Sequence, residues 1–304
     1  MKKNIIISGA SGFIGRALVK YLNNLEYSVI CLVHKKENLI SLNNVSSKLF
    51  SLDDVSSLLT EIPHQKDAIF LHLAWCGSIG KERGDPFLQL KNVNQSLQLL
   101  KIAKEIGCQR FIFVSSIAEN ESYRITTENC GEIDSHFFYG AAKLSTRMFL
   151  EIYAKELNIE FINAKLCNVY GIGDYSHRML NSTLIKCINR ETLCFTSGVQ
   201  NYDFVYIDDV VKALKLIIEK GKASSKYTIG SGRPRKLKDF LTELNINLFP
   251  GIKFTYGNVP FKGVNLDLTN FSIEELSRDT GYSPAINFIE GCKKTSDWIK
   301  TWTK

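Results

Sequence analysis

The sequence predicts an α/β fold with a doubly wound parallel sheet and a smaller C-terminal α/β lobe. Short runs of continuous apolar residues alternate with segments of helical periodicity, a pattern typical of parallel strands that helices cover on both faces. Beyond residue 170 this alternation becomes irregular, and the segments are short. Such a region favours a lobe built over the carboxyl ends of the strands, where sheets of this kind bind ligands.

The elements can be justified in order along the chain. Asn4–Ser8 is an apolar run that ends at a glycine, and Phe13–Leu25 follows with apolar residues at helical spacing. The same two patterns predict the later strands and helices. These are the strands Val29–Val33, Ala68–Ala74, Arg110–Ser116 and Phe161–Leu166, and the helices Phe87–Ile106 and Tyr139–Leu157.

Three glycines between the first strand and the first helix carry the first functional signal. In a strand–helix–strand unit, such a triplet indicates a dinucleotide site. Gly9 permits the tight turn, Gly12 lets a pyrophosphate approach the backbone, and Gly15 lets the helix pack on the strand. The anion would meet the free N–H groups and the positive dipole of the helix end.

This places the predicted sheet in the Rossmann type and suggests a division of the chain. Residues 1–168 are expected to form an NAD(P)-binding domain that also receives 203–217. Residues 169–304 are expected to form the smaller, substrate-binding lobe.

A tyrosine and a lysine, Tyr139 and Lys143, share one face of a predicted helix. That helix follows a strand whose end carries Ser115 and Ser116, at the rim where the cofactor would lie. The pKa of a tyrosine in water is about 10, so the side chain must become more acidic to transfer a proton at neutral pH. A neighbouring lysine and the positive charge of oxidised nicotinamide both favour the phenolate. Tyr139 is therefore a candidate proton donor to a carbonyl oxygen.

Six motifs in order resemble the extended short-chain dehydrogenase/reductases, the NAD(P)-dependent epimerases, dehydratases and reductases of nucleotide sugars. They are GASGFIG at Gly9, HLAW at His72, FVSSIAE at Phe113, YGAAK at Tyr139, NVYG at Asn168 and DFVYIDDV at Asp203. The resemblance covers nearly the whole chain. It implies that Ser116 rather than Ser115 is the active serine and that Ser116, Tyr139 and Lys143 are the catalytic residues.

The resemblance also implies the binding residues. Those expected to bind the cofactor are Gly9, Ser11, Gly12, Phe13, Ile14, Gly15, His34, Lys35, Asp53, Leu73, Ala74, Tyr139 and Lys143. Those expected to bind the substrate are Trp75, Ser116, Asn168 and Arg178. One position departs from the family, because Tyr202 stands where an arginine often binds the substrate's phosphates. Arg178 or Lys262 would take over that task.

The end of the second strand bears on the choice of cofactor. Proteins that bind NAD usually carry an Asp or Glu there, which binds the adenosine ribose and repels a 2′-phosphate. Here the position is Val33, followed by His34, Lys35 and Lys36, with no arginine beside them to grip a phosphate through two bonds. We expect NADP(H) to be preferred, with NAD(H) possible.

The serine segment narrows the activity. Sugar 4,6-dehydratases of this family carry an Asp-Glu pair at the positions of Ile117 and Ala118, and related epimerase-reductases carry a cysteine at that of Ala118. Two enzymatic interpretations remain. One is NADPH-dependent reduction of a nucleotide-linked 4-keto-(6-deoxy) sugar, for the synthesis of surface polysaccharide precursors. The other is a nucleotide-sugar C4-epimerase with bound NAD. A non-catalytic NADP-binding sensor is a third interpretation, disfavoured because the catalytic residues are kept.

Composition bounds the remaining expectations. The formal charge of +7 is typical of a lysine-rich surface, and no basic cluster is dense enough to predict nucleic acid binding. No apolar run reaches the roughly 18 residues of a membrane span. The five histidines lack metal-ligand spacing, so no metal is expected. Eight cysteines without a CxxC pair indicate reduced thiols and a cytoplasmic protein.

The two longest predicted helices bear on assembly. They carry more apolar residues than one buried face requires, for example Leu97, Leu100, Met148 and Phe149. In the family that the chain resembles, the equivalent helices pair across a two-fold axis. A homodimer is therefore expected.

Overall fold

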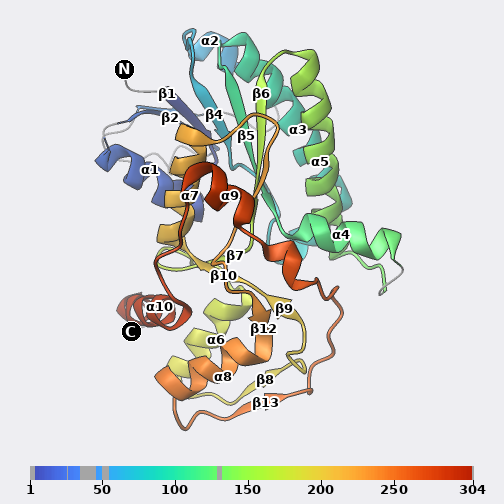
Figure 1. Ribbon diagram of the computed structural model, residues 1–304, viewed down its shortest axis with the longest axis vertical. Coiled ribbons are helices and arrows are strands. Elements are labelled where there is room, and N and C mark those ends of the chain that lie inside the picture. Colours follow the sequence, from blue (N-terminus) through green and yellow to red (C-terminus); the bar gives the residue numbers. More distant parts are fainter. Residues whose placement is uncertain (1–3, 26, 35–45, 50–54, 129–131, 303–304) are drawn as a thin grey trace.

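A computed structural model describes residues 4–25, 27–34, 46–49, 55–128 and 132–302 (Figure 1). Within this part of the chain, seven strands form one parallel sheet in the order β11-β6-β5-β4-β1-β2-β3. In chain order the strands are β1 (Asn4–Ser8), β2 (Ser28–Val33), β3 (Ser46–Leu49), β4 (Ile69–His72), β5 (Arg110–Ser116), β6 (Glu160–Leu166) and β11 (Lys226–Ile229). The direction of strand order reverses between β1 and β4, and ligands bind beside such a switch point.

Helices cover both faces of this sheet, as Figure 1 shows. On one face lie α1 (Phe13–Asn24) and α7 (Ile207–Lys220), and on the other lie α3 (Pro86–Glu105) and α5 (Phe137–Glu156). Successive side chains of a strand point to opposite faces. Accordingly Ile5 and Ile7 belong to the core under α1 and α7, whereas Ile6 belongs to the core under α3 and α5. A strand buried on both faces is apolar at nearly every position, which is why the runs do not alternate.

The smaller lobe is built from three short strand pairs and three helices. β7 (Asn168–Tyr170) pairs with β10 (Phe204–Tyr206), β8 (Leu193–Phe195) with β13 (Phe254–Tyr256), and β9 (Asn201–Tyr202) with β12 (Arg235–Lys236). The helices are α6 (Met179–Ile188), α8 (Leu237–Leu248) and α10 (Phe288–Trp302). None of the helices in the described ranges is long and apolar enough to cross a membrane.

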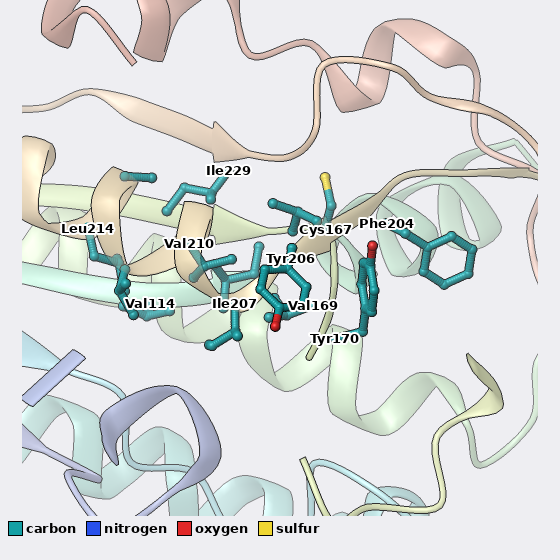
Figure 2. Packing of buried hydrophobic residues seen from close by; sticks show 14 of the residues in the cluster. Val114, Cys167, Val169, Tyr170, Phe204, Tyr206, Ile207, Val210, Leu214 and Ile229 are labelled. Carbon is teal, nitrogen blue, oxygen red and sulfur yellow. The ribbon is translucent and has the colours of Figure 1, made fainter. Parts of the chain in front are cut away.

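One hydrophobic core joins the sheet to the lobe. Figure 2 shows it at the ends of the strands, where Val114 and Ile229 of the sheet continue into Val169, Tyr170 and Phe204 of the lobe. Tyr170 packs edge-on against Phe204, with ring centroids 6.2 Å apart. The lobe is therefore anchored directly over the carboxyl edge of the sheet.

The predicted fold class is confirmed, and the predicted elements end within about two residues of the observed ones. The sequence patterns did not indicate the short elements β3, α2 (Leu58–Glu61) and α4 (Ala118–Thr127), nor the 3-10 helices η2 (Lys81–Gly84) and η3 (Leu268–Phe271). They also did not indicate that β11 adds a seventh strand beside β6. Helix α9 (Glu274–Thr280) packs against α7 and β11. The large sheet thus draws on more of the C-terminal half than 203–217, and the domain division stays a prediction.

Candidate active site

A cavity of about 780 Å³ lies between the carboxyl edge of the sheet and the smaller lobe. Most of the predicted site residues line it. These are Gly9, Gly12, Phe13, Ile14, Gly15, Leu73, Trp75, Ser116, Tyr139, Lys143, Asn168 and Arg178. The β1, β4 and β5 ends supply one wall, α5 a second, and the lobe a third. Residues more than 160 positions apart in the chain therefore meet around one space.

The turn from β1 into α1 has the geometry that an anion requires. Gly9 adopts a φ of +76°, and a Cβ there would come within 2.6 Å of the Ala74 backbone nitrogen. A Cβ at Gly15 would come within 2.2 Å of the Gly9 carbonyl oxygen. At Gly12 a Cβ would meet only that same oxygen, at 3.3 Å. No side chain caps α1 at Gly12, so the first N–H groups of the helix are available to a ligand. The turn fits the pyrophosphate of a dinucleotide.

Arg16 ties this turn to the smaller lobe. Its guanidinium donates to the Ser11 carbonyl oxygen at 2.6 Å and to the Gly173 carbonyl oxygen at 3.0 Å. Gly173 belongs to the segment that leads from β7 to α6. The glycine turn and the lobe are thus held together by one side chain.

His72 joins the ends of β1 and β4 to helix α3 under the site. Its Nε2 donates to Ser96 Oγ at 2.9 Å, because that hydroxyl donates its own proton to the Asn92 carbonyl oxygen. The Ser8 hydroxyl donates to Nδ1 at 2.7 Å. Burial lowers the pKa of His72 to about 3, so the ring is neutral and can act as both donor and acceptor. Its place in the HLAW motif is therefore structural.

Ser116, Tyr139 and Lys143 meet where β5 ends beside α5. Tyr139 is 8% exposed and Lys143 is 3% exposed. Ser116 is hydrogen-bonded to Tyr139, and its Oγ also accepts from the Ala118 backbone N–H at 3.3 Å. Lys143 Nζ donates to the Val114 carbonyl oxygen at 3.0 Å. The arrangement sets a hydrogen-bonded pair of hydroxyls at the cavity wall, with Lys143 four residues further along α5.

Aromatic rings and charges surround this group. Lys143 Nζ lies 3.8 Å from the ring centroid of Trp75 and 4.7 Å from that of Phe113. Burial lowers the pKa of Lys143 to about 7, although Glu119 opposes the shift. Burial also raises the pKa of Tyr139, against the effects of Arg83, the Ser116 hydrogen bond and Arg178. At neutral pH the phenol is thus protonated and the lysine is near its midpoint.

The lobe side of the cavity holds the predicted substrate residues. Asn168 donates from its side-chain nitrogen to the Asp203 carbonyl oxygen at 3.3 Å, which closes β7 onto β10. Asp203 is fully buried and accepts from the backbone N–H and the hydroxyl of Ser231. Arg178 stands at the N-cap of α6 and lines the cavity, whereas Lys262 is exposed and lies outside the cavity wall. Of the two candidates for a phosphate-binding cation, only Arg178 is at the site.

Some predicted cofactor residues are not on the cavity wall. Ser11 contributes its carbonyl oxygen to Arg16, and the Ala74 N–H donates to Ser8 Oγ at 3.4 Å, so both support the turn from behind. His34 is exposed at the end of β2. Lys35 and Asp53 lie outside the described residues.

Arg83, on η2, is a cavity residue that the sequence patterns did not single out. Its Cζ lies 4.2 Å from the ring centroid of Tyr139. Glu121 of α4 lines the same part of the cavity, and burial raises the pKa of its carboxyl while Arg83 opposes this. The loop position after HLAW was the available signal, but it could not identify which side chain turns inward. Among the described residues, no three His, Cys, Asp or Glu side chains gather as a metal ion would require.

Comparison with known proteins gives a consistent result. A model of the NAD dependent epimerase/dehydratase family matches residues 5–230. CDP-abequose synthase of Salmonella typhimurium strain LT2 is 28% identical over 312 residues, which cover 97% of each chain. A trifunctional UDP-glucose 4,6-dehydratase/UDP-4-keto-6-deoxy-D-glucose 3,5-epimerase/UDP-4-keto-L-rhamnose-reductase of Arabidopsis thaliana is 27% identical over 323 residues, covering 97% of this chain and 47% of that protein.

Among solved structures, the UDP-glucose 4-epimerase of Thermotoga maritima with UDP-glucose is similar in fold. The TM-score is 0.80 and the sequence identity is 26%, and the match covers 99% of this chain and 100% of that one. The likeness therefore extends over both the sheet and the smaller lobe.

Proposed function

The chain belongs to the NAD dependent epimerase/dehydratase family, and on that basis we propose that it reduces the keto group of a nucleotide-linked 4-keto-(6-deoxy) sugar with NADPH. One observation carries the proposal. Ser116, Tyr139 and Lys143 line the same cavity as the glycine turn of α1. A proton donor, a carbonyl-binding hydroxyl and a dinucleotide cradle thus surround the same space.

Each side chain then has one task. Tyr139 donates its proton to the carbonyl oxygen of the sugar, and Ser116 holds that oxygen by a hydrogen bond. Lys143, close to its midpoint, stabilises the phenolate that remains on Tyr139. The turn at Gly12 holds the pyrophosphate of the cofactor. When bound, the reduced nicotinamide supplies the hydride to the carbonyl carbon.

The residues that follow Ser116 favour reduction over elimination of water. Ile117 is buried and Ala118 begins α4. Neither side chain can donate or accept a proton, which a dehydratase needs at these positions for the departing hydroxyl. These two positions therefore supply neither an acid nor a base for the removal of water from the sugar.

The names of the relatives support a sugar nucleotide as the substrate class. CDP-abequose synthase makes a CDP-linked sugar, and the plant protein includes a UDP-4-keto-L-rhamnose-reductase activity. The epimerase from Thermotoga maritima supports the second interpretation, C4-epimerisation with bound NAD. The two differ in whether the cofactor leaves oxidised or is restored within each cycle.

Cofactor preference separates these interpretations. β2 ends at Val33, an apolar residue at the position where a carboxylate would repel a 2′-phosphate, and His34 directly beyond it is exposed. This supports a preference for NADP(H), which suits a reductase that consumes NADPH. If the measured dissociation constants show that NAD(H) binds at least as tightly as NADP(H), the epimerase would be favoured over the reductase.

The activity is tested by following NADPH oxidation with 4-keto sugars linked to CDP, dTDP, GDP and UDP. We expect one of these substrates to be reduced at C4. Tyr139→Phe removes the proton donor and should lower the rate by about 10²–10⁴-fold, while dissociation constants for the cofactor stay near the wild-type values.

Three results would contradict the proposal. One is a Tyr139→Phe protein with near wild-type turnover, which would remove Tyr139 from the chemistry. A second is interconversion of UDP-linked hexoses at C4 without net NADPH oxidation, which would establish the epimerase. The third is cofactor binding without turnover of any substrate, which would point to the sensor.

A further inference from the structure

Arg83 holds a place beside Tyr139 that the proposed chemistry leaves unused. Its guanidinium carbon lies 4.2 Å from the centroid of the Tyr139 ring. Trp75 meets the same ring edge-on, with centroids 6.1 Å apart and an interplanar angle of 87°. Cations over the face of an aromatic ring are attracted by its quadrupole. The ring of Tyr139 is thus held on its face by a cation and at a second side by an indole.

The loop that carries Arg83 is fastened to α3. Gln89 accepts from Trp75 Nε1 at 2.9 Å, and it donates to the carbonyl oxygens of Gly77 and Glu82 at 2.9 and 3.1 Å. Both Gln89 and the neighbouring Asn92 are buried. Supporting hydrogen bonds from a regular helix hold a loop in a defined geometry. Arg83 is therefore held in place by structure that lies outside Tyr139 itself.

Asn92 completes this fastening next to Trp75. Its side chain accepts from the Cys76 N–H at 3.0 Å and donates to the Cys76 carbonyl oxygen at 2.9 Å. Arg83 also donates to the Ser78 carbonyl oxygen at 3.3 Å. The loop thus presents Trp75 and Arg83 to the tyrosine as one unit.

Several charges face the phenol of Tyr139. Arg83 comes from η2, and Arg178 comes from the start of α6. Glu119 of α4 acts in the opposite sense. Glu119 is itself paired with Arg147, whose Nε lies 2.9 Å from its Oε2, and Glu121 faces Arg83. A guanidinium keeps its charge at every working pH, whereas Lys143 titrates near neutrality.

We propose that Arg83 is a positioning residue for Tyr139, which orients the phenol ring and lowers its proton affinity through a cation held over the ring face. The role rests on the proposed function only insofar as Tyr139 is the proton donor. The effect on the phenol itself is a property of the protein and does not depend on the sugar.

The test measures the pKa of Tyr139 directly. The protein is labelled with ring-¹³C tyrosine and saturated with NADP⁺, and the Tyr139 signal is assigned by its loss in Tyr139→Phe. Arg83→Met keeps a long side chain and removes the charge. It should raise the pKa of Tyr139 by about one unit or more, since a cation at this distance typically shifts a pKa by about 1–3 units.

Two further variants make the result specific. Lys81→Met removes a positive charge from the same 3-10 helix, where Lys81 is exposed, and should leave the pKa of Tyr139 unchanged. Arg83→Lys retains a cation but loses the planar group, and should give an intermediate pKa. Should Arg83→Met fail to bind NADP⁺, the Arg83→Lys titration alone decides the matter.

The rate provides a second readout. Because the donor must be protonated to reduce a ketone, the alkaline fall in kcat should move to higher pH in Arg83→Met by the same amount as the pKa. The proposal is overturned if Arg83→Met and Arg83→Lys change the pKa of Tyr139 no more than Lys81→Met does. The titration needs no substrate, so it stands even if none of the 4-keto sugars is reduced.

Discussion

Lys143 is a buried cation whose proton links the site to the stability of the fold. Its Nζ donates to the Val114 carbonyl oxygen and lies over the rings of Trp75 and Phe113. Burial lowers its pKa to about 7, while a lysine of the unfolded chain has a pKa of about 10. Between these pH values the unfolded chain binds a proton that the folded chain has lost. The free energy of unfolding therefore rises with pH across this window.

Lys143→Met should remove that dependence. We expect the free energy of unfolding of the wild type, relative to Lys143→Met, to increase from about pH 7 to about pH 10, as measured by urea unfolding of the cofactor-free protein. Lys101→Met is the matched control, because the Lys101 side chain is 58% exposed and its loss should not alter the slope. A relative stability that stays level or falls over this range would refute the placement of the lysine.

Two glycines of the turn between β1 and α1 serve different purposes, one in folding and one in binding. Gly15 lies inside α1 against the backbone of Gly9 and Ala10, with no room for a Cβ. Gly12 has an ordinary extended backbone, and a Cβ there would have its nearest neighbour at 3.3 Å. A methyl group at Gly12 would therefore project toward the ligand, and one at Gly15 would press into the protein.

The pair Gly12→Ala and Gly15→Ala should accordingly fail in different ways. Alanine favours a helix interior over glycine by about 1 kcal/mol, but an overpacked contact costs about 1–3 kcal/mol and here involves backbone atoms. Gly15→Ala should thus lower the free energy of unfolding. Gly12→Ala should remain close to the wild type in stability and weaken cofactor binding. Urea unfolding and fluorescence titration with NADPH measure both, and equal cofactor affinity in Gly12→Ala and wild type would contradict the pyrophosphate site.

At the scale of the whole molecule, α3 and α5 present an apolar surface to solvent. Phe87 and Leu90 of α3 are 82% and 63% exposed, and Met148, Phe149 and Ile152 of α5 are each more than half exposed. Leu100, expected on this surface, is fully buried in the core instead, because it lies on the side of α3 that faces the sheet. The exposed set still supports the proposed homodimer, in which these two helices pair with their copies.

If the chain forms a homodimer, light scattering at micromolar protein should give the mass of two chains, and this mass should not depend on concentration. Phe149→Glu should shift the mass toward one chain, since a carboxylate in an apolar interface costs more than the contact it replaces. Ile246→Glu is the control, because Ile246 is 67% exposed on α8 of the smaller lobe. A one-chain mass for the wild type would contradict the dimer.

The sequence by itself determined five strands of the sheet, the helices α1, α3 and α5, and the grouping of the candidate catalytic residues. Continuous apolar runs, helical spacing and the glycine triplet are local signals, and each is read within about a dozen neighbouring residues. Tyr139 and Lys143 fall on one helix face because they are four residues apart, and Ser116 follows because its strand ends beside that helix. Local spacing is sufficient to predict that two side chains lie together when one regular element positions both of them.

The tertiary structure alone decided what comes to the site from afar. Arg83 meets Tyr139 because α3 fastens its loop through Gln89, and no local pattern encodes which side of a loop turns inward. Likewise β11 joins the large sheet only because α7 brings the chain back beside β6. Packing between distant segments also decides that Arg178, and not Lys262, lines the cavity. Contacts between distant segments depend on packing of the whole core, which residue spacing does not record.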